Sequence, residues 1–421
     1  MKILILHRIP YQKIDYHRGI DHERHDVVYF GKKEALLTLP AALRCTAVER
    51  PGVASALDEA RQWLQANPQH FDRVISLSEY ELLDAAHLRE WLDVPGAPVE
   101  QVRLARDKML MKEAVARAGL RVPRFLSLPE FLASGGRAPW QPATVLKPHS
   151  GASSEDVVIF PTAAEAFDAL VARRSGVVSL DTSQGDPSGY EVEEFISGPI
   201  LHFDGLVDNG QVTVMTASEY VGNCLLFANG HPLGSYHYPL DDEEREWVCS
   251  ALRATGINSG SFHLEAIRHG EDLVFLEVAN RVGGADVVRT FELATGIHLP
   301  SQELKIFMNE AAYASVAPVS VRANDRWHGW FVYPGHHLSD ESNPGVVGTD
   351  AFRYSESMVH WHELEQGAVL KRHITYQAHE VPLAGVVVTT SAQTTRAWMK
   401  TLFDSVSYRT TTLPRHAAEV Q

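Results

Sequence analysis

Cysteine is scarce in this chain of 421 residues. Its three cysteines, Cys45, Cys224 and Cys249, are odd in number and widely spaced, which excludes a disulfide framework and a cysteine-rich zinc site. Free cysteines of this kind suit a reducing compartment. We therefore expect the protein in the cytoplasm.

Long apolar runs are missing as well. No run approaches the ~20 residues that span a bilayer, so we expect no membrane partner. The apolar residues 3–6 are followed at once by His7 and Arg8, whereas a secretory signal has a longer apolar core and a cleavage site. Residues 3–6 are instead typical of a buried parallel strand.

Basic residues are too few to balance the acidic ones. The chain has 38 Lys and Arg against 53 Asp and Glu, a formal net charge of −15. Surfaces that bind nucleic acid need clustered Lys and Arg, so we expect no nucleic-acid partner. The common phosphate motifs G-x-x-x-x-G-K-[ST] and G-x-G-x-x-G are absent too. A polyanionic ligand would need a local basic pocket or metal ions.

The composition predicts a folded protein, because 45% of the chain is hydrophobic. At roughly 100–200 residues per domain, its length suggests two to four domains. In the first hundred residues, apolar runs at 27–30 and 73–77 alternate with an amphipathic helical pattern at 55–66. Such alternation predicts a mainly parallel sheet. A Pro-Gly-Ala-Pro run at 95–98 marks a boundary.

The middle of the chain predicts mixed α+β structure. The expected elements are a helix at 106–119, a strand at 144–147, a small-residue loop at 148–154, a strand at 157–160, a helix at 162–174, a loop at 183–189, a strand at 190–196 and a helix at 242–256. The last hundred residues are rich in strand patterns and close with a strand at 384–390 and a helix at 394–403. We therefore predict an α/β and α+β multidomain protein.

Two carboxylates form the most informative pattern. Residues 262–267 and 272–278 are strand-like runs joined by a short turn, which indicates a hairpin. A turn centred on Glu271 places Glu265 directly opposite Glu277. Like charges facing each other are destabilising unless something offsets them, and divalent cations do so. A solvated sheet face, or a register one residue different, is the alternative.

Arg281 and the glycines Gly283 and Gly284 follow these acids. An arginine there, with glycines that permit close backbone approach, suits stabilisation of a developing phosphoryl or acyl charge. Pairing of Arg281 with one of the acids explains it equally well.

Two lysines add positive charge. Lys147 ends an apolar strand next to the small-residue loop, whose backbone N–H groups could cover phosphates, and Lys108 opens the preceding helix. The strand at 191–196 offers an apolar slot with backbone donors and acceptors for an adenine ring. Taken singly, each lysine is more often a surface charge, and the strand is equally well an ordinary edge strand.

Taken in order, these pieces resemble the ATP-grasp superfamily. The matching segments are Arg106-Asp107-Lys108, Val145-Leu146-Lys147-Pro148, the loop to Glu155, Glu193-Glu194-Phe195-Ile196, Glu265, and the segment from Glu277 to Gly284, over roughly residues 1–300. The resemblance implies an ATP-grasp fold in four parts: an N-terminal Rossmann-like pre-ATP-grasp domain (1–98), subdomain A (99–188), subdomain B (189–305) and a strand-rich C-terminal extension (306–421).

The resemblance also implies roles for individual residues. ATP would be bound by Lys108, Lys147, Ser150, Gly151, Ser153, Ser154, Glu193, Glu194, Phe195 and Ile196, with His202 and Asp204 as weaker candidates. Glu265, Glu277 and Asn280 would bind metal, which the resemblance implies to be two Mg²⁺ ions, with Mn²⁺ as an alternative. Arg281 would stabilise the acyl phosphate and the tetrahedral intermediate.

Two departures from the family pattern stand out. Many members have Glu-x-Asn-x-Arg where this chain has Ala279, with Asn280 one residue late, and an acid that often binds the ribose is Ile200 here. The Glu-x-Ala-x-Arg pattern is similar to the branch of L-amino-acid ligases (dipeptide synthetases) and related carboxylate–amine ligases.

That branch implies ATP-dependent amide formation between small-molecule carboxylate and amine substrates, such as two amino acids, through an acyl phosphate. ATP-dependent carboxylation and a non-catalytic nucleotide-binding module are the alternatives, and a homodimer is one option for the assembly. Candidate substrate residues are Tyr236, His237, Gly283, Gly284 and Arg289. The segment at 218–239 that holds the first two could equally be a surface excursion.

Overall fold

The computed structural model describes residues 1–151, 153–182, 184–309 and 326–409. It consists of two compact units, one formed by Met1–Glu219 and Tyr238–Ala323 and the other by Tyr220–His237 and Asn324–Gln421. The predicted four-part division is finer than this and stays a prediction. Among the described residues, no helix combines the length and apolar character that crossing a membrane requires.

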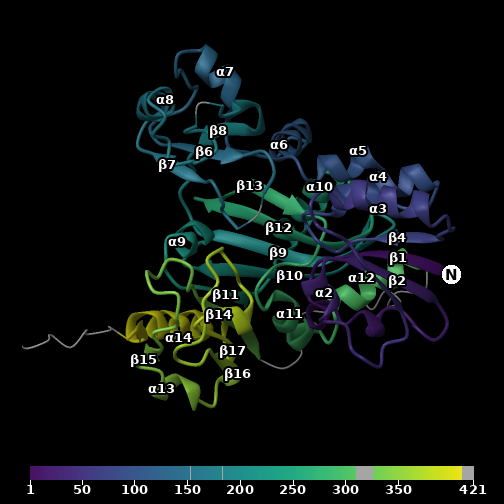
Figure 1. Cartoon of the computed structure of the whole chain (residues 1–421). Coiled ribbons are helices and arrows are strands. Elements are labelled where there is room, and N and C mark those ends of the chain that lie inside the picture. Colours follow the sequence, from purple (N-terminus) through teal and green to yellow (C-terminus); the bar gives the residue numbers. More distant parts are fainter. Residues whose placement is uncertain (152, 183, 310–325, 410–421) are drawn as a thin grey trace, which may run out of the picture. The chain divides into compact units, whose positions relative to one another are not determined.

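The N-terminal part of the first unit is built on a parallel sheet (Figure 1). Its strands, in spatial order, are β3 (Thr46–Glu49), β2 (Asp26–Gly31), β1 (Lys2–His7) and β4 (Arg73–Ile75). Its helices are α1 (Tyr11–Ile14), α2 (Lys33–Leu36), α3 (Ala56–Ala66), α4 (Leu82–Leu92) and α5 (Val99–Leu104), with a 3₁₀ turn at Tyr16–Arg18. The predicted parallel sheet is confirmed.

Both faces of this sheet are buried, which explains the apolar run at the N-terminus. Side chains alternate along a strand. Ile3 and Ile5 therefore pack towards α1 and α12 (Leu299–Phe307), while Leu4 and Leu6 pack towards α3 and α4.

An antiparallel sheet follows in the chain. Its strands, in spatial order, are β5 (Phe125–Ser127), β8 (Tyr190–Glu194), β6 (Thr144–Pro148) and β7 (Val158–Phe160). The helices of this region are α6 (Lys108–Arg117), α7 (Leu128–Ala133) and α8 (Ala163–Val171), with a 3₁₀ turn at Pro187–Gly189. The predicted helix at 106–119 and strand at 144–147 are confirmed.

The start of α6 is set by a side chain. Asp107 caps the helix by accepting hydrogen bonds from the backbone N–H groups of Met109 and Leu110 at 2.9 and 3.1 Å. Lys108 is consequently the first helical residue, and its position is fixed by the cap.

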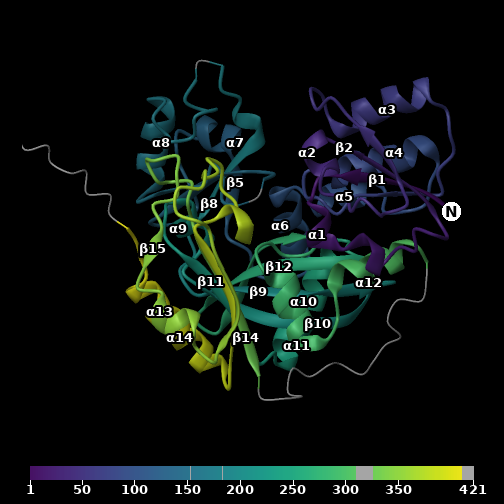
Figure 2. The same cartoon turned by 60° about the horizontal axis from the view of Figure 1, so that its bottom comes forward.

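A third group of strands completes the first unit. In spatial order they are β13 (Asp272–Ala279), β12 (Gly260–His269), β9 (Ile200–Asp208) and β10 (Gln211–Val221), all antiparallel to their neighbours. Figure 2 shows them with α10 (Asp242–Ala254) and α11 (Val287–Thr295) nearby. Asp241 caps α10 in a capping box with Glu244, so the predicted helix at 242–256 is confirmed.

The two faces of these strands differ in chemistry. One face packs apolar side chains, among them Phe203 and Phe262, against α6 and α10. The alternate positions form what we call the polar face: His202 and Asp204 on β9, His263 and Glu265 on β12, and Glu277 on β13.

The predicted pairing of Glu265 with Glu277 is confirmed, although by a different route. The turn holds only two residues, because His269 pairs with Asp272, and this register alone would place Glu265 opposite Leu276. A β-bulge next to Glu265 advances the register by one residue and brings Glu277 opposite it.

The second unit is also strand-rich. Its sheet runs in the order β11 (Leu233–Tyr238), β14 (Trp327–Tyr333), β17 (Leu383–Thr389) and β16 (Met358–Glu363), and a small pair joins β15 (Val346–Val347) to β18 (Ser407–Tyr408). Its helices are α9 (Cys224–Ala228), α13 (Asp350–Arg353) and α14 (Ala392–Ser405), with a 3₁₀ turn at Ala378–Glu380. The predicted strand at 384–390 and helix at 394–403 are confirmed.

Some predicted segments are only partly described. Residue 152 of the small-residue loop, residue 183 of the next loop, and residues 310–325 and 410–421 of the C-terminal extension lie outside the described residues.

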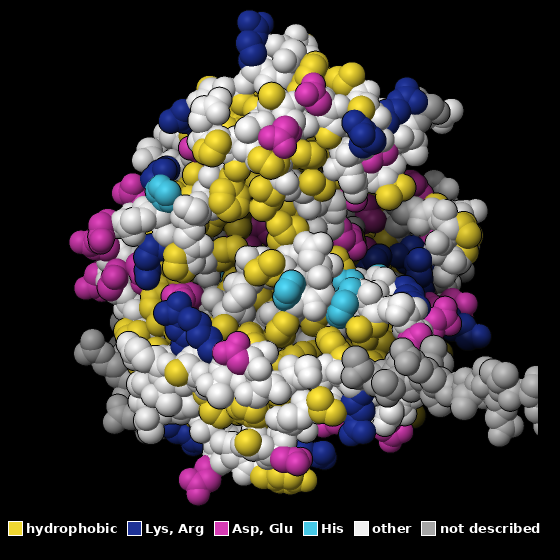
Figure 3. Space-filling model, turned by 90° about the vertical axis from the view of Figure 1, so that its left-hand side faces the viewer, with side chains coloured by type: hydrophobic (Ala, Val, Ile, Leu, Met, Phe, Trp, Pro, Cys, Tyr) yellow, Lys and Arg dark blue, Asp and Glu magenta, His cyan; other side chains and the backbone are white. Residues whose placement is uncertain are grey.

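On the described part of the face in Figure 3, basic side chains are dispersed among acidic ones. The expected lack of a nucleic-acid partner stays a prediction.

Arg50 links two parts of the N-terminal domain through buried carboxylates. Its Nη1 lies 2.9 Å from Glu59 Oε2 and its Nη2 2.9 Å from Glu81 Oε1. Burial opposes ionisation of Glu59, but backbone N–H donors including that of Ala54, together with Arg50, outweigh burial and lower its pKa to about 2. This carboxylate therefore stabilises the fold in its ionised form.

Replacing Glu59 by Gln should reduce the free energy of unfolding at pH 7 by roughly 3 kcal/mol, at about 1.4 kcal/mol per unit of pKa difference. Because the folded-state pKa is depressed, the stabilisation is present above the ordinary value of 4.5 and is lost as pH falls through about 2. Urea unfolding at pH 7 and pH 3 should show the gap to wild type narrowing. Glu23→Gln, in an exposed pair with Arg44, is the control and should change stability by less than about 1 kcal/mol. If Glu59→Gln and Glu23→Gln reduce the free energy of unfolding equally, the stabilising role of ionised Glu59 is wrong.

Candidate active site

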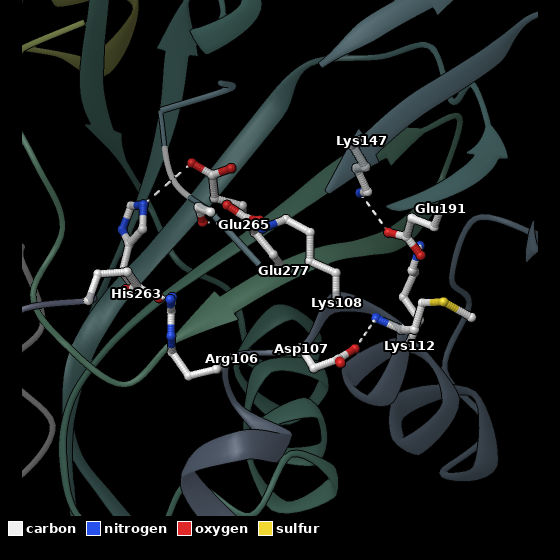
Figure 4. A network of polar contacts seen from close by, with 12 residues as sticks. Arg106, Asp107, Lys108, Lys112, Lys147, Glu191, His263, Glu265 and Glu277 are labelled. Atoms are coloured by element: carbon white, nitrogen blue, oxygen red, sulfur yellow. Dashed lines mark hydrogen bonds and ion pairs between the residues drawn. The ribbon is translucent and has the colours of Figure 1, made fainter. Parts of the chain in front are cut away.

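The polar face carries two facing carboxylates, and a lysine of α6 contacts one of them (Figure 4). Glu277 Oε2 lies 2.8 Å from Nζ of Lys108 on α6. Burial opposes ionisation of Glu277, but Lys108, Lys147 and Arg281 outweigh it and lower the pKa of Glu277 to about 2. In Figure 4, Glu265 lies beside this pair. The ionised carboxylate of Glu277, the facing carboxylate of Glu265 and the ammonium of Lys108 thus lie together.

A buried network of two lysines and two glutamates lies next to α6. Lys112 Nζ is 2.8 Å from Glu191 Oε2 and 2.6 Å from Glu193 Oε2, and Lys147 Nζ is 2.7 Å from Glu193 Oε1. Burial lowers the pKa of Lys147, but Glu193 and Glu191 outweigh burial and raise it. Lys147 is therefore charged and held in place. The carboxylate of Glu193, for which the family resemblance implies ATP binding, is part of this network.

Arg281 is held by a carboxylate from the parallel-sheet domain. Its Nε donates to Glu79 Oε2 at 2.5 Å, and its Nη1 donates to Val282 O at 2.7 Å. The other oxygen of Glu79 accepts a hydrogen bond from Arg106, just before α6. Glu79 lies beyond the carboxyl end of β4, the edge at which open α/β sheets bind ligands. One buried carboxylate thus orients two guanidinium groups.

Two hydrogen bonds and an ion pair link four side chains across the polar face. His202 Nδ1 is 2.5 Å from Asp204 Oδ2, His263 Nδ1 is 2.8 Å from Asp204 Oδ1, and His263 Nε2 is 3.4 Å from Glu265 Oε1. Burial lowers the pKa of His263, but Asp204 and Glu265 outweigh it and raise it to about 9. His202 and Asp204 share one face, as predicted. Their role towards a nucleotide stays a prediction.

The predicted phosphate loop lies close to α6. Lys108 Nζ donates to Gly151 O at 3.4 Å. Ser153 and Ser154 have left-handed backbone conformations, with φ of 64° and 55°, and Ser150 is exposed. The structure therefore brings this loop to Lys108, and phosphate binding stays a prediction.

The predicted strand at 190–196, which was expected to bind adenine, forms β8 and ends at Glu194. The backbone N–H of Glu194 donates to Arg124 O at 2.8 Å and that of Phe195 to Ala143 O at 3.2 Å. The Phe195 side chain is 42% exposed, whereas Ile196 is buried. Phe195 thus offers an exposed aromatic ring at the end of the strand.

Asn280 is not brought to the carboxylates. Its Nδ2 donates to the carbonyls of Ser259 and Ser261 at 3.1 and 2.8 Å. Strand alternation places Ala279, not Asn280, on the face of Glu277. The predicted metal contact of Asn280 is therefore not proposed further.

The predicted substrate residues belong to both units. Gly283 is buried and Gly284 exposed, and Arg289 is exposed on α11. Tyr236 and His237 are buried on β11, within the second unit. All five stay predictions.

Sequence reasoning missed Glu79, Lys112 and Glu191. Glu79 could have been found from its place after a parallel strand. Lys112 lies four residues after Lys108, one helical turn on, and so shares its face. Glu191 shares a strand face with Glu193. No local signal indicated that both Lys112 and Glu191 would be fully buried.

No protein-family model matches the chain. In sequence the chain is similar to the L-arginine-specific L-amino acid ligase of Bacillus subtilis, with 25% identity over 259 residues, or 59% of this chain and 60% of that protein. The match therefore spans less than two thirds of the relative's length.

In structure the chain is similar to the L-amino acid ligase of Bacillus licheniformis, with a TM-score of 0.70 and 19% identity over 97% of this chain and 98% of that one. It is also similar to N5-carboxyaminoimidazole synthetase of Staphylococcus aureus complexed with ADP, with a TM-score of 0.65 and 14% identity over 96% of each chain. Both have the ATP-grasp fold. The chain has the ATP-grasp fold.

The predicted ATP-grasp fold is therefore confirmed, and L-amino acid ligases are among the proteins that this chain matches in sequence and in structure. Within the ATP-grasp fold, the lysines, the acidic hairpin and Arg281 belong to the same compact unit.

Replacing Lys112 by Met should reduce the free energy of unfolding by about 3–5 kcal/mol, because two buried carboxylates lose a partner. Burial raises the pKa of Glu191, so a second change, Glu191→Gln, should restore part of the loss. Urea unfolding measures both effects. On the same helix, Arg117→Met breaks an exposed pair with Glu113 and should cost less than about 1 kcal/mol. A loss at Lys112 no larger than at Arg117 would be incompatible with the network described.

Proposed function

We propose that this protein is an ATP-dependent carboxylate–amine ligase that joins two L-amino acids by an amide bond and releases ADP and phosphate. The L-amino acid ligases among its similar proteins support this choice of substrates. The retained lysines, metal carboxylates and arginine support an enzyme over a binding module.

One observation carries the proposal: Lys108 and Glu277 neutralise each other at 2.8 Å, next to Glu265. Each has the charge that one half of a magnesium–nucleotide complex requires. A phosphate suits the ammonium of Lys108, and a divalent cation suits the carboxylate of Glu277. Binding of the complex would exchange one ion pair for two without leaving a buried charge unpaired.

The two carboxylates fit a divalent cation. Ionised carboxylates are acceptor-only oxygen ligands, the type that Mg²⁺ and Mn²⁺ prefer, and the facing pair is otherwise repulsive. Glu265 and Glu277 would hold the ion. When bound, Mg²⁺ offsets negative charge on the transferring phosphoryl group.

The chain's own residues would bind and orient the reactants. Lys108 and Lys147 would compensate phosphate charge while a carboxylate oxygen of the first amino acid attacks the γ-phosphorus and ADP leaves. The amine of the second amino acid would then attack the acyl carbon, lose a proton and expel phosphate. Arg281, oriented by Glu79, would stabilise the tetrahedral oxyanion.

The proposal predicts phosphate release from ATP and Mg²⁺ with at least one pair among the twenty L-amino acids, together with a dipeptide detected by mass spectrometry. Glu277→Gln should lower this turnover by at least about 100-fold, since it removes a metal ligand. Glu271→Gln changes an exposed acid in the turn of the same hairpin and should leave turnover unchanged.

One outcome would overturn the proposal and favour ATP-dependent carboxylation. In that outcome no amino-acid pair causes phosphate release, whereas bicarbonate supplied with a small amine does. Full activity of Glu277→Gln would overturn the metal assignment.

A further inference from the structure

The row of linked side chains on the polar face ends at Glu265, one of the two proposed metal carboxylates. His263 lies directly opposite Asp204 across β12 and β9, and Glu265 lies opposite His202. The four side chains are therefore neighbours on one face, and their contacts follow from strand register alone.

The contacts run in order from His202 through Asp204 and His263 to Glu265. Asp204 accepts from His202 at one oxygen (2.5 Å) and contacts His263 Nδ1 with the other (2.8 Å), and the second nitrogen of His263 faces Glu265 Oε1 at 3.4 Å. A carboxylate accepts hydrogen bonds only, so His263 donates from Nδ1 to Asp204, while its Nε2 faces Glu265 at ion-pair distance. Asp204 fixes the plane of the His263 ring, and the ring fixes one oxygen of Glu265.

Burial and close packing hold these four side chains in place. His202 and Asp204 are each 1% exposed, and His263 and Glu265 are each 8% exposed, so little water competes for the contacts. The loop after Arg281 rests on the same hydrogen bond: a Cβ atom on Gly283 would lie 2.9 Å from both Asp204 Oδ1 and His263 Nδ1. A glycine is required for this approach.

We propose that Asp204 and His263 are positioning residues that orient Glu265 for the divalent cation, with His202 as the outer support. The inference rests on the proposed function, because Glu265 must be a metal ligand for it to hold. Outer partners that orient ligating groups typically change metal affinity 10–100-fold when they are removed.

A competing assignment makes the same side chains a metal site themselves. One ligand atom each from His202, Asp204 and His263 lies within 4.8 Å of the others. However, the Nδ1 atoms of both histidines are already at hydrogen-bond distance from Asp204. We therefore favour orientation of Glu265 and make a separate metal site an outcome of the test.

The test is a Mn²⁺ titration of the full chain, followed by electron paramagnetic resonance in the presence of a non-hydrolysable ATP analogue. Asp204→Asn keeps the shape but replaces an accepting oxygen by an N–H donor, and should weaken Mn²⁺ binding about 10–100-fold. Affinity for the analogue in EDTA should stay unchanged. A purely structural role would not separate these two affinities.

Two further variants grade the effect. His202→Gln removes only the outer support and should weaken Mn²⁺ binding by less than Asp204→Asn. Gly283→Ala pushes on the hydrogen bond without changing a ligand, and should also weaken Mn²⁺ binding, which keeps the test decisive if Asp204→Asn does not fold. Asp208→Asn, at the end of the same strand, is the matched control and should bind Mn²⁺ like wild type.

The outcomes are distinguishable. Wild-type Mn²⁺ affinity in all folded variants overturns the positioning role. Loss of one of two bound Mn²⁺ ions in Asp204→Asn, with the other unaffected, shows a separate metal site and also overturns it. Failure of the wild-type protein to bind Mn²⁺ with the analogue overturns the proposed function itself, and with it this inference.

Discussion

Pairing of opposite charges within the folded core is the constraint on which the site depends. An ionised carboxylate or ammonium taken out of water is costly unless a partner offsets it. In this chain Lys108 offsets Glu277, Lys112 and Lys147 offset Glu191 and Glu193, and Glu79 offsets Arg281. The chain thus assembles charged groups that would bind a nucleotide and a metal without leaving them unpaired beforehand.

Strand alternation delivers these groups to one place. The same strands that bury Phe203 and Phe262 on one face present His202, Asp204, His263 and Glu265 on the other. The apolar face anchors the strands beneath α6 and α10, so the polar face stands on a packed core. A single β-bulge then sets Glu277 opposite Glu265. Removal of the bulge would place Leu276 there instead.

Much of this arrangement could be predicted from the sequence, because short-range residue patterns determine the strands, the helices and the hairpin. Apolar periodicity predicted the parallel strands and α6, and the acidic hairpin predicted the Glu265–Glu277 pair. The sequence did not predict the bulge. The prediction assumed a turn centred on Glu271, whereas the turn holds two residues; the bulge offsets this difference, so the predicted Glu265–Glu277 pairing is right. Asn280 was expected near the metal because of its place in the motif, whereas its amide binds backbone carbonyls.

Long-range partners could not be predicted in the same way. Glu79 and Arg281 are 202 residues apart in the chain, and no pattern within either segment indicates that they meet. Lys112 and Glu191 look like ordinary surface charges in sequence, whereas in the fold they contact each other and are fully buried. The candidate substrate residues Tyr236, His237 and Arg289 remain predictions.

The most direct test of the central claim is a crystal structure with Mn²⁺ and ADP, in which anomalous scattering locates the metal. The account predicts a Mn²⁺ peak in contact with Glu265 and Glu277, and Lys108 Nζ moved from Glu277 to a phosphate oxygen. A nucleotide-bound structure in which the 2.8 Å pair between Lys108 and Glu277 persists, with no metal at either carboxylate, would contradict it.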